Sequence, residues 1–231
     1  MNNTKANVVF QFFPHLNRQA KSRILQLEDL YTFWNKQINV ISRKDLPHLY
    51  IRHVLHSLSL SVVIKAPPFV SGQTVLDAGT GGGFPGIPLA IVHPDCHFIL
   101  CDSIKKKIKV VEHVVRELKL HNVTPVVSRI EDLPERICGV VVSRAVTQLC
   151  GFLPWIRNKV AEEGRLMFLK GGDLSQEIAQ AAAVCRIAED NFTVTSLKDR
   201  FGSVGDGFFE TKKICEIKQT SYLCAPLVKS S

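Results

Sequence analysis

The 231-residue sequence contains no apolar stretch of the roughly 20 residues that a membrane-spanning helix needs. Its longest candidate, residues 58–70, is interrupted by Lys65 and by Pro67-Pro68. The first residues, Met1 to Lys5, lead into no apolar core followed by a small-residue cleavage site, which a secretory signal would require. We therefore expect a cytoplasmic protein that has no membrane partner.

Cysteine pairs are also missing. None of the cysteines forms a Cys-x-x-Cys motif, their number is odd, and no Cys/His cluster has the spacing of zinc ligands. This pattern excludes a disulfide framework and predicts no metal site; we expect reduced, mostly buried thiols. The seven cysteines lie at positions 96, 101, 138, 150, 185, 215 and 224.

The sequence has no internal repeat and no low-complexity tract, and its hydrophobic content of 45% suffices for one substantial core with a small appendage. Lys and Arg number 29 against 21 Asp and Glu, a net charge of +8 that favours a polyanionic partner such as nucleic acid. The alternative is that the basic groups are ordinary solvated faces. These groups are Arg18, Lys21 and Arg23; Arg43-Lys44; Lys105 to Lys107 with Lys109; and Lys198, Arg200, Lys212 and Lys213.

A glycine-rich segment, residues 75–86, follows an apolar run that ends in an aspartate. This is typical of a parallel strand that turns sharply into a helix, with the backbone open to a ligand at the carboxyl edge of an α/β sheet. Gly81-x-Gly83-x-x-Gly86 fits the dinucleotide fingerprint. Asp77-x-Gly79-x-Gly81-x-Gly83 equally resembles the first motif of S-adenosylmethionine-dependent methyltransferases. A plain surface turn is the third interpretation.

Strand and helix patterns alternate after this loop and predict a Rossmann-like α/β fold with a mainly parallel seven-stranded sheet. The last two strands lack a helix between them, which indicates an antiparallel edge and suits a methyltransferase better than a dehydrogenase. A break near residue 66 divides an N-terminal helical appendage, 1–66, from an α/β domain, 67–231, which under the methyltransferase interpretation is the S-adenosylmethionine-binding methyltransferase domain. The expected helices are 17–41, 48–64, 87–92, 104–118, 149–160 and 174–187; the expected strands are 74–76, 97–101, 123–130, 140–142, 165–169, 192–197 and 212–217.

Polar residues follow three further strands. Asp102 ends the second strand, where a carboxylate accepts hydrogen bonds from ribose hydroxyls of either cofactor. Asp102 or Ser103 could instead cap the next helix. Ile130 and Glu131 follow the third strand, where they would reach an adenine, although Glu131 could equally be an exposed loop acid. Arg144 follows the fourth strand and has either a functional role or a structural ion pair.

The absence of several catalytic motifs narrows the range of reactions that this protein could catalyse. The sequence offers no acid/base group for hydride transfer, no Asn/Asp-Pro-Pro-aromatic motif after the fourth strand, and no Pro-Cys nucleophile. The acceptor that remains needs little activation. Guanine N7 carries a lone pair and no proton, so alignment and exclusion of water would be enough, and a general base would contribute little.

The glycine segment and its continuation, residues 76–90, are similar to the signature of the glucose-inhibited division protein B family, bacterial 16S ribosomal RNA (guanine-N7) methyltransferases. The Gly-Phe-Pro-Gly-Ile-Pro ending is its most specific part. The resemblance spans roughly residues 25 to 175 and implies transfer of a methyl group from S-adenosylmethionine to guanine N7 in 16S rRNA, naked or in the small subunit. It also rests on Trp34-Asn35, Ile38-Asn39, Arg52-His53, Leu55 to Leu58, Asp102-Ser103, Arg129 to Glu131, Ser143 to Ala145 and Lys170-Gly171.

The resemblance implies roles for single residues. Gly79 and Phe84 would contact the methionine end of the cofactor. The full cofactor-binding set would be Asp77, Gly79, Gly81, Gly83, Phe84, Asp102, Ser103, Ile130, Glu131 and Arg144. Within it, Asp102 and Ser103 would hold the ribose, and Ile130 and Glu131 would lie near the adenine. Candidates to line the substrate site are Arg52, His53, Ser57, Arg144 and Lys170, with no catalytic residue assigned.

Several alternatives stay open. On a regular helix, positions 53 and 57 share a face, which would point to the target nucleotide or simply to solvent. Lys170 would pair with RNA phosphate or end a strand in solvent. His56 stands where many relatives have Asp, and Gly82 where alanine is common. Rival functions are a cofactor-sensing RNA-binding module without turnover and a nicotinamide-dependent oxidoreductase. We expect a monomer.

Overall fold

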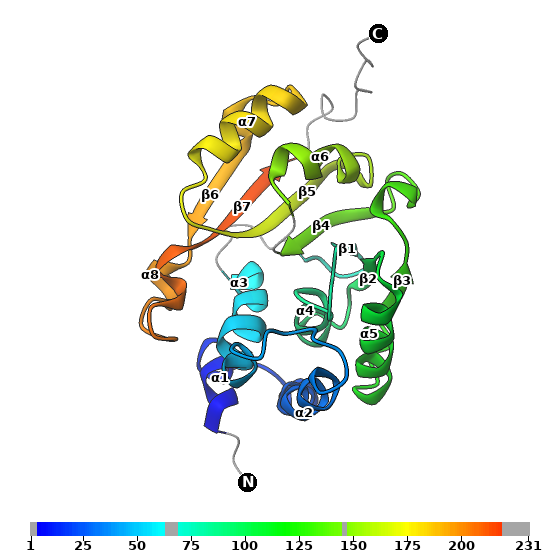
Figure 1. The fold of residues 1–231 in the computed structure, drawn as a ribbon, viewed down its shortest axis with the longest axis vertical. Helices are drawn as coiled ribbons and strands as arrows, with labels where there is room; N and C mark the ends of the chain where they lie inside the picture. Colours follow the sequence, from blue (N-terminus) through cyan, green and yellow to red (C-terminus); the bar gives the residue numbers. More distant parts are fainter. Residues whose placement is uncertain (1–3, 63–68, 145–146, 219–231) are drawn as a thin grey trace.

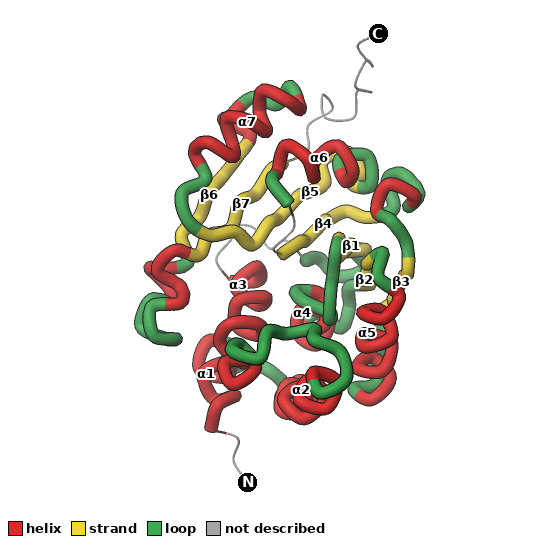
Figure 2. The backbone as a smooth tube through the Cα atoms, viewed as in Figure 1, coloured by secondary structure: helices red, strands yellow, loops and turns green. Residues whose placement is uncertain are grey.

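The computed structural model describes residues 4–62, 69–144 and 147–218, and in these a single sheet lies between two layers of helices (Figure 1; Figure 2). The sheet has seven strands in the order β3-β2-β1-β4-β5-β7-β6. β7 runs antiparallel to both of its neighbours, and the other pairs are parallel. The predicted fold class with its antiparallel edge is confirmed. The strands are β1 Thr74–Ala78, β2 His97–Asp102, β3 Val123–Val127, β4 Cys138–Arg144, β5 Val160–Gly171, β6 Phe192–Ser196 and β7 Lys212–Lys218.

Alternation along the central strands creates two cores. Val75 and Val140 point into one hydrophobic cluster, whereas their neighbours Leu76 and Val141 point into the other. The first cluster lies under α1 Asn7–Phe12, α2 Arg18–Asn35, α3 His56–Val62, α4 Gly86–Val92, α5 Lys105–Glu117 and α8 Lys198–Phe201; the second lies under α6 Leu149–Ile156 and α7 Ser175–Cys185. Short helical turns are η1 Thr4–Ala6, η2 Leu46–His48, η4 Ile130–Asp132, η5 Glu189–Asn191 and η6 Phe208–Thr211, and η3 Leu49–Leu55 is a π-helix.

The N-terminal helices bury their apolar side chains in the same cluster as the sheet. Leu27 of α2 and Leu58 of α3 belong to one core with Val75 and Phe98. The proposed boundary near residue 66 falls outside the described residues, so the division into 1–66 and 67–231 stays a prediction.

The first helix is shorter than predicted. α2 ends at Asn35, because the Asn35 side chain accepts the N–H groups of Val40 and Ile41, both at 3.0 Å, and donates to the Ile41 carbonyl at 2.8 Å. These bonds stabilise a loop in place of further helical turns. Ile41 nevertheless stays buried, which is why the apolar spacing imitated a longer helix.

Other boundaries also differ. The predicted helix 48–64 consists of η3 and then α3, which ends at Val62; residues 63–64 lie outside the described range. β3 stops at Val127 and is followed by the η4 turn rather than continuing to residue 130. The helix predicted to reach residue 160 ends at Ile156, and β5 begins at Val160 because Val160 pairs with Cys138 across a register irregularity.

Within the described ranges, no helix is both long and apolar enough to cross a membrane. Five of the six described cysteines are buried and all six are free, whereas Cys224 lies outside the described residues. In the same ranges no three His, Cys, Asp or Glu side chains are grouped closely enough to hold a metal ion.

Candidate methyltransferase site

The glycine loop is held by a buried carboxylate. Asp77 is 0% exposed, and its Oδ2 accepts the Thr80 hydroxyl at 2.6 Å and the Gly86 N–H at 2.7 Å. Gly79 has φ +75° and Gly83 φ +104°, a backbone region in which side chains other than glycine are strained. Asp77 therefore ties the end of β1 to the start of α4, and the glycines allow the sharp turn between them.

Tyr31 of α2 packs beneath this loop, a residue that the sequence analysis missed. Its hydroxyl donates to the Gly82 carbonyl at 2.7 Å, and its ring lies 4.8 Å from that of Phe84. A Cβ at Gly83 would lie 2.3 Å from Ile87 Cδ1 and 3.1 Å from the Tyr31 hydroxyl. Helical spacing from Ile24 and Leu27 could have indicated that Tyr31 is buried, but not its loop contact.

The Asp77 carboxyl group is expected to respond to pH near neutrality. Burial raises its pKa to about 7, against the opposing effect of the hydrogen bonds from Thr80 and Gly86. Its Oδ1 atom is buried without a hydrogen-bond partner. Because the folded-state pKa is raised, the stability associated with the neutral carboxyl is complete below pH ~4, the ordinary pKa of Asp, and is lost as pH rises through about 7.

The substitution Asp77→Asn tests this linkage, because the amide oxygen can accept both hydrogen bonds and carries no charge. Its stability relative to wild type should rise by about 2–3 kcal/mol between pH 5 and pH 8. Urea unfolding at both pH values measures the difference, and Asp132→Asn, at an exposed position, is the control. An Asp77→Asn variant whose relative stability does not change with pH would contradict the assignment.

A cavity of about 650 Å³ opens at the carboxyl ends of β1, β2 and β3. Five predicted cofactor residues line it: Gly79, Asp102, Ser103, Ile130 and Glu131. Trp155 of α6, which the sequence analysis missed, also lines it. The predicted residues of three strand ends therefore meet at one cavity, as the carboxyl edge of a parallel sheet requires.

Asp102 has several partners in this wall. Its Oδ2 accepts the Gly81 N–H at 3.0 Å, and its Oδ1 accepts the Ile104 N–H at 2.9 Å beside the start of α5. Lys107 Nζ lies 3.5 Å from Oδ2. The carboxylate lines the cavity, as one interpretation required. It holds a turn just before α5, but the N-cap of that helix is Ile104 and has no side-chain cap hydrogen bond, so the capping interpretation is wrong.

A second cavity of about 280 Å³ collects four of the five substrate candidates: Arg52, His53, Arg144 and Lys170. Its other lining residues include Asp45, His56, Phe208 and Lys212, which the sequence analysis did not select. The lining residues come from the turn before η2, from η3, α3 and η6, and from the ends of strands β4, β5 and β7. No local motif links these segments, so their juxtaposition had no sequence signal.

Arg144 lines this second cavity and has three close partners. Its Nη2 lies 3.0 Å from His53 Nδ1, its Nη1 donates to the Arg52 carbonyl at 3.3 Å, and its guanidinium lies 5.1 Å from the Phe84 ring centre. Burial, followed by the charge of Arg144, lowers the pKa of His53 to about 3, so the imidazole is neutral and accepts from the guanidinium. Burial lowers the pKa of Arg144 to about 10, which leaves it cationic at neutral pH.

The fifth candidate, Ser57, does not line the cavity. It is 0% exposed, and its hydroxyl donates to the His53 carbonyl at 2.6 Å. Lys170 lines the cavity, but its ammonium pairs with Glu177 at 2.7 Å and donates to the Thr147 carbonyl at 3.2 Å. Lys170 is therefore held in an ion pair, which neither of its two interpretations anticipated.

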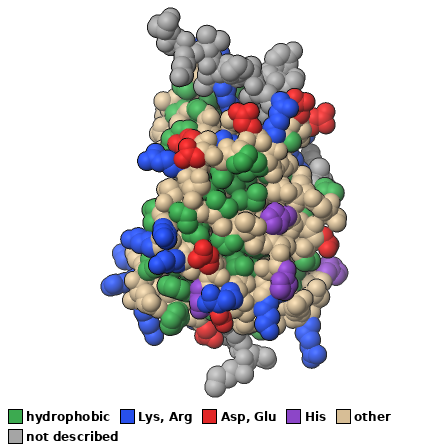
Figure 3. Space-filling model, turned by 90° about the vertical axis from the view of Figure 1, so that its right-hand side faces the viewer, with side chains coloured by type: hydrophobic (Ala, Val, Ile, Leu, Met, Phe, Trp, Pro, Cys, Tyr) green, Lys and Arg blue, Asp and Glu red, His purple; other side chains and the backbone are tan. Residues whose placement is uncertain are grey.

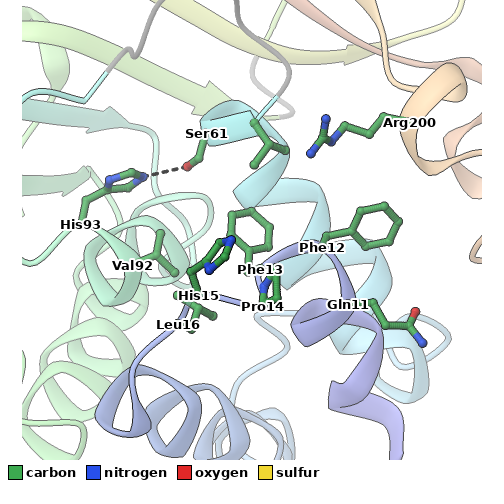
Figure 4. A pocket seen from close by; sticks show the side chains of 11 residues that line it. Gln11, Phe12, Phe13, Pro14, His15, Leu16, Ser61, Val92, His93 and Arg200 are labelled. Atoms are coloured by element: carbon green, nitrogen blue, oxygen red, sulfur yellow. Dashed lines mark hydrogen bonds between the residues drawn. The ribbon is translucent and has the colours of Figure 1, made fainter.

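A third cavity, of about 720 Å³, lies away from all these candidates (Figure 4). It is bounded by the α1–α2 connection and by the ends of α3 and α4, and Ser61 and His93 form a 2.8 Å hydrogen bond in its wall. None of the predicted site residues lines it.

Basic side chains also lie outside the cavities. Figure 3 views the side of the molecule that carries α5, and Lys and Arg side chains are spread over its lower part. In the α5 group, Lys105, Lys106 and Lys109 are exposed and Lys107 is half-buried. The grouping is compatible with docking to a polyanion, which stays a prediction.

The strand order, the glycine loop and the cavity at the strand ends together define a Rossmann-like methyltransferase. M. jannaschii TYW2, solved in complex with AdoMet, matches this fold with a TM-score of 0.54 at 14% identity, covering 72% of this chain and 74% of that chain. That likeness concerns the fold alone.

The particular family follows from the sequence comparisons. The chain matches the family GidB, rRNA small subunit methyltransferase G, over residues 20–201, and it belongs to that family. It is 44% identical over 210 residues to "Ribosomal RNA small subunit methyltransferase G" of Christiangramia forsetii, covering 88% of this chain and 92% of the relative. The protein of the same name from Flavobacterium johnsoniae is 43% identical over 215 residues, covering 90% and 96%. The resemblance inferred from the sequence motifs is confirmed.

Proposed function

We propose that this protein transfers the methyl group of S-adenosylmethionine to N7 of a guanine in 16S rRNA. One observation carries the proposal: two cavities of different character open at the ends of two neighbouring strands. Asp77 of β1 pairs with Val142 of β4, so Gly79, which lines the first cavity, and Arg144, which lines the second, follow adjacent strand ends. A cofactor and an acceptor bound in these cavities would meet there.

The first cavity fits the cofactor by its shape and its polar groups. Gly81 has φ +59°, and a Cβ built there meets no atom within 4 Å, so space is open above this part of the loop. Asp102 presents a carboxylate at the ribose position, and the unpaired Oδ1 of Asp77 lies beneath the loop. S-adenosylmethionine supplies a methyl group activated on a sulfonium. Asp77, Gly79, Gly81, Gly83, Phe84, Asp102, Ser103, Ile130, Glu131 and Arg144 are proposed to hold it.

The second cavity fits an electron-rich, anionic acceptor. Arg52, Arg144 and Lys212 line it, and the Phe208 ring lies 4.8 Å from Lys212 Nζ. Guanine O6 and RNA phosphates accept hydrogen bonds from such cations. In this proposal Arg144 and its neighbours orient the base and exclude water, and N7 attacks without first losing a proton. Neutral His53 holds the Arg144 guanidinium in place.

The proposed substrate is 16S rRNA, either naked or in an assembling small subunit, and the proposed form of the protein is a monomer in the cytoplasm. Incubation with radiolabelled S-adenosylmethionine and 16S rRNA or subunits lacking the modification should transfer label. Reduction with borohydride followed by aniline should cut the labelled RNA at one position, since N7-methylguanosine is sensitive to this treatment.

Different failures of this assay have different meanings. Tight RNA binding with no methylated product in any assembly state would overturn the proposal in favour of a cofactor-sensing RNA-binding module. Label that resists borohydride and aniline would place the methyl group elsewhere than on N7. A rise in melting temperature with a nicotinamide dinucleotide and none with S-adenosylmethionine would contradict the cofactor assignment.

A further inference from the structure

His56 of α3 is a buried polar residue in the wall of the second cavity. It is 6% exposed, and its ring lies edge-on to the rings of Phe208, at 5.3 Å, and Phe209, at 6.0 Å. Its Nε2 atom has no hydrogen-bond partner. An unpaired buried polar atom costs folding free energy, so its presence beside a cavity points to a ligand that supplies the partner.

The hydrogen bonding of the ring defines what that partner must be. His56 also hydrogen-bonds to the backbone of Arg52. The nitrogen involved is Nδ1, because Nε2 is unpaired, and a ring nitrogen that binds a carbonyl one helical turn earlier is a donor. Burial, followed by the charges of Arg144 and Lys212, lowers the pKa of His56 well below its ordinary value. The neutral ring therefore presents Nε2 as a lone-pair acceptor.

Hydrogen-bond donors dominate the rest of the cavity wall. Arg52, Arg144, Lys170 and Lys212 carry donors only. The one carboxylate among the described lining residues, Asp45, already accepts from Arg52 at 2.6 Å and from the Ser42 hydroxyl at 2.7 Å. A ligand that satisfies both the cations and Nε2 must carry acceptors on one edge and a donor on another.

Guanine has this distribution, with O6 and N7 on one edge and the 2-amino group on the opposite edge. We propose that His56 Nε2 accepts a hydrogen bond from the 2-amino group of the acceptor guanine, which makes His56 a specificity-determining residue. The proposal rests on the function proposed above. In this proposal the base lies with N7 toward the cofactor and its 2-amino edge toward the ring contact between His56 and Phe208.

Inosine, which lacks only the 2-amino group, tests the contact. The methylated guanine is first located by aniline cleavage, and a 16S rRNA carrying inosine at that position is then assembled by ligation. Wild-type kcat/KM for the inosine RNA should fall about tenfold to a hundredfold, the usual effect of leaving a buried partner unpaired. His56→Leu should lose a similar factor with guanine RNA and show no further loss with inosine RNA. His56→Gln, whose amide oxygen can replace Nε2, should keep a preference for guanine.

Folding and the cofactor site are checked separately. Melting temperature and S-adenosylmethionine affinity should be close to wild type in both His56 variants, and His121→Gln, at an exposed position, should behave as wild type throughout. If His56→Leu does not fold, His56→Asn, which keeps a donor at the Nδ1 position, takes its place. Equal wild-type rates on guanine and inosine RNA, or an inosine penalty that persists in the Leu or Asn variant, would overturn this proposal. A wild-type protein that methylates no RNA would instead overturn the proposed function.

Discussion

Replacing Gly79 with isoleucine is expected to abolish detectable binding of S-adenosylmethionine, a loss of at least about a hundredfold in affinity. Gly79 has φ +75° and lines the 650 Å³ cavity, so a branched side chain both strains the backbone and occupies ligand space. The strain alone costs about 1–3 kcal/mol. Isothermal titration calorimetry measures the affinity, and thermal melting measures the accompanying loss of stability.

Gly72→Ile is the matched control for this loss. Gly72 has φ +81°, and a Cβ there meets no atom within 4 Å, but the residue lies in the turn before β1 and does not line the cofactor cavity. The two variants should therefore lose similar stability, whereas the control should bind the cofactor as wild type does. Retained titration heat in Gly79→Ile would contradict the placement of the cofactor above this turn.

Replacing Arg144 with methionine is expected to lower kcat/KM for methyl transfer to RNA by about 10²- to 10³-fold, the usual effect of removing one oriented donor from a reaction site. The guanidinium bonds to His53 and to the Arg52 carbonyl at the edge of the second cavity. Methionine fills similar volume without charge, so the folded protein should persist. Initial rates at varied RNA concentration, with saturating cofactor, measure the effect.

Two comparisons separate a local effect from a general loss of positive charge. Arg116→Met removes a cation from α5 whose side chain is 68% exposed, and it should change the rate only slightly. Arg144→Lys keeps the charge but cannot reproduce both hydrogen bonds, so its rate should lie between methionine and wild type. If Arg144→Met binds the cofactor within a few-fold of the wild-type affinity, the defect lies in the interaction with the acceptor. If Arg144→Met methylates RNA at the wild-type rate, Arg144 is not part of the site.

The predicted residues that line a cavity in the structure have local signals in the sequence. Gly79 and Asp102 lie at the ends of apolar strands, and parallel strands bring their carboxyl ends to one edge of the sheet. A cavity at this edge of the sheet could therefore be predicted from the sequence, without knowledge of the residues that form its walls. Arg144 had a similar signal, because it directly follows the apolar run of the fourth strand, which it ends in the structure.

The missed residues have no such signal. Phe208 and Lys212 reach the second cavity from a segment more than 60 residues beyond Arg144 in the chain. The helical-face argument paired His53 with Ser57, but Leu49–Leu55 is π-helical and does not keep the regular periodicity. As a result His53 and His56 line the cavity, whereas Ser57 is buried.

The amino-acid sequence by itself determined the family, the order of strands and helices and the glycine loop, because these depend on periodicity and on glycines placed a few residues apart. Only the tertiary structure decided the composition of the second cavity, the ion pair of Lys170 and the unpaired nitrogen of His56. Those features arise where η3, α3, α7, η6 and three strand ends converge, and packing between distant segments leaves no pattern within any one of them.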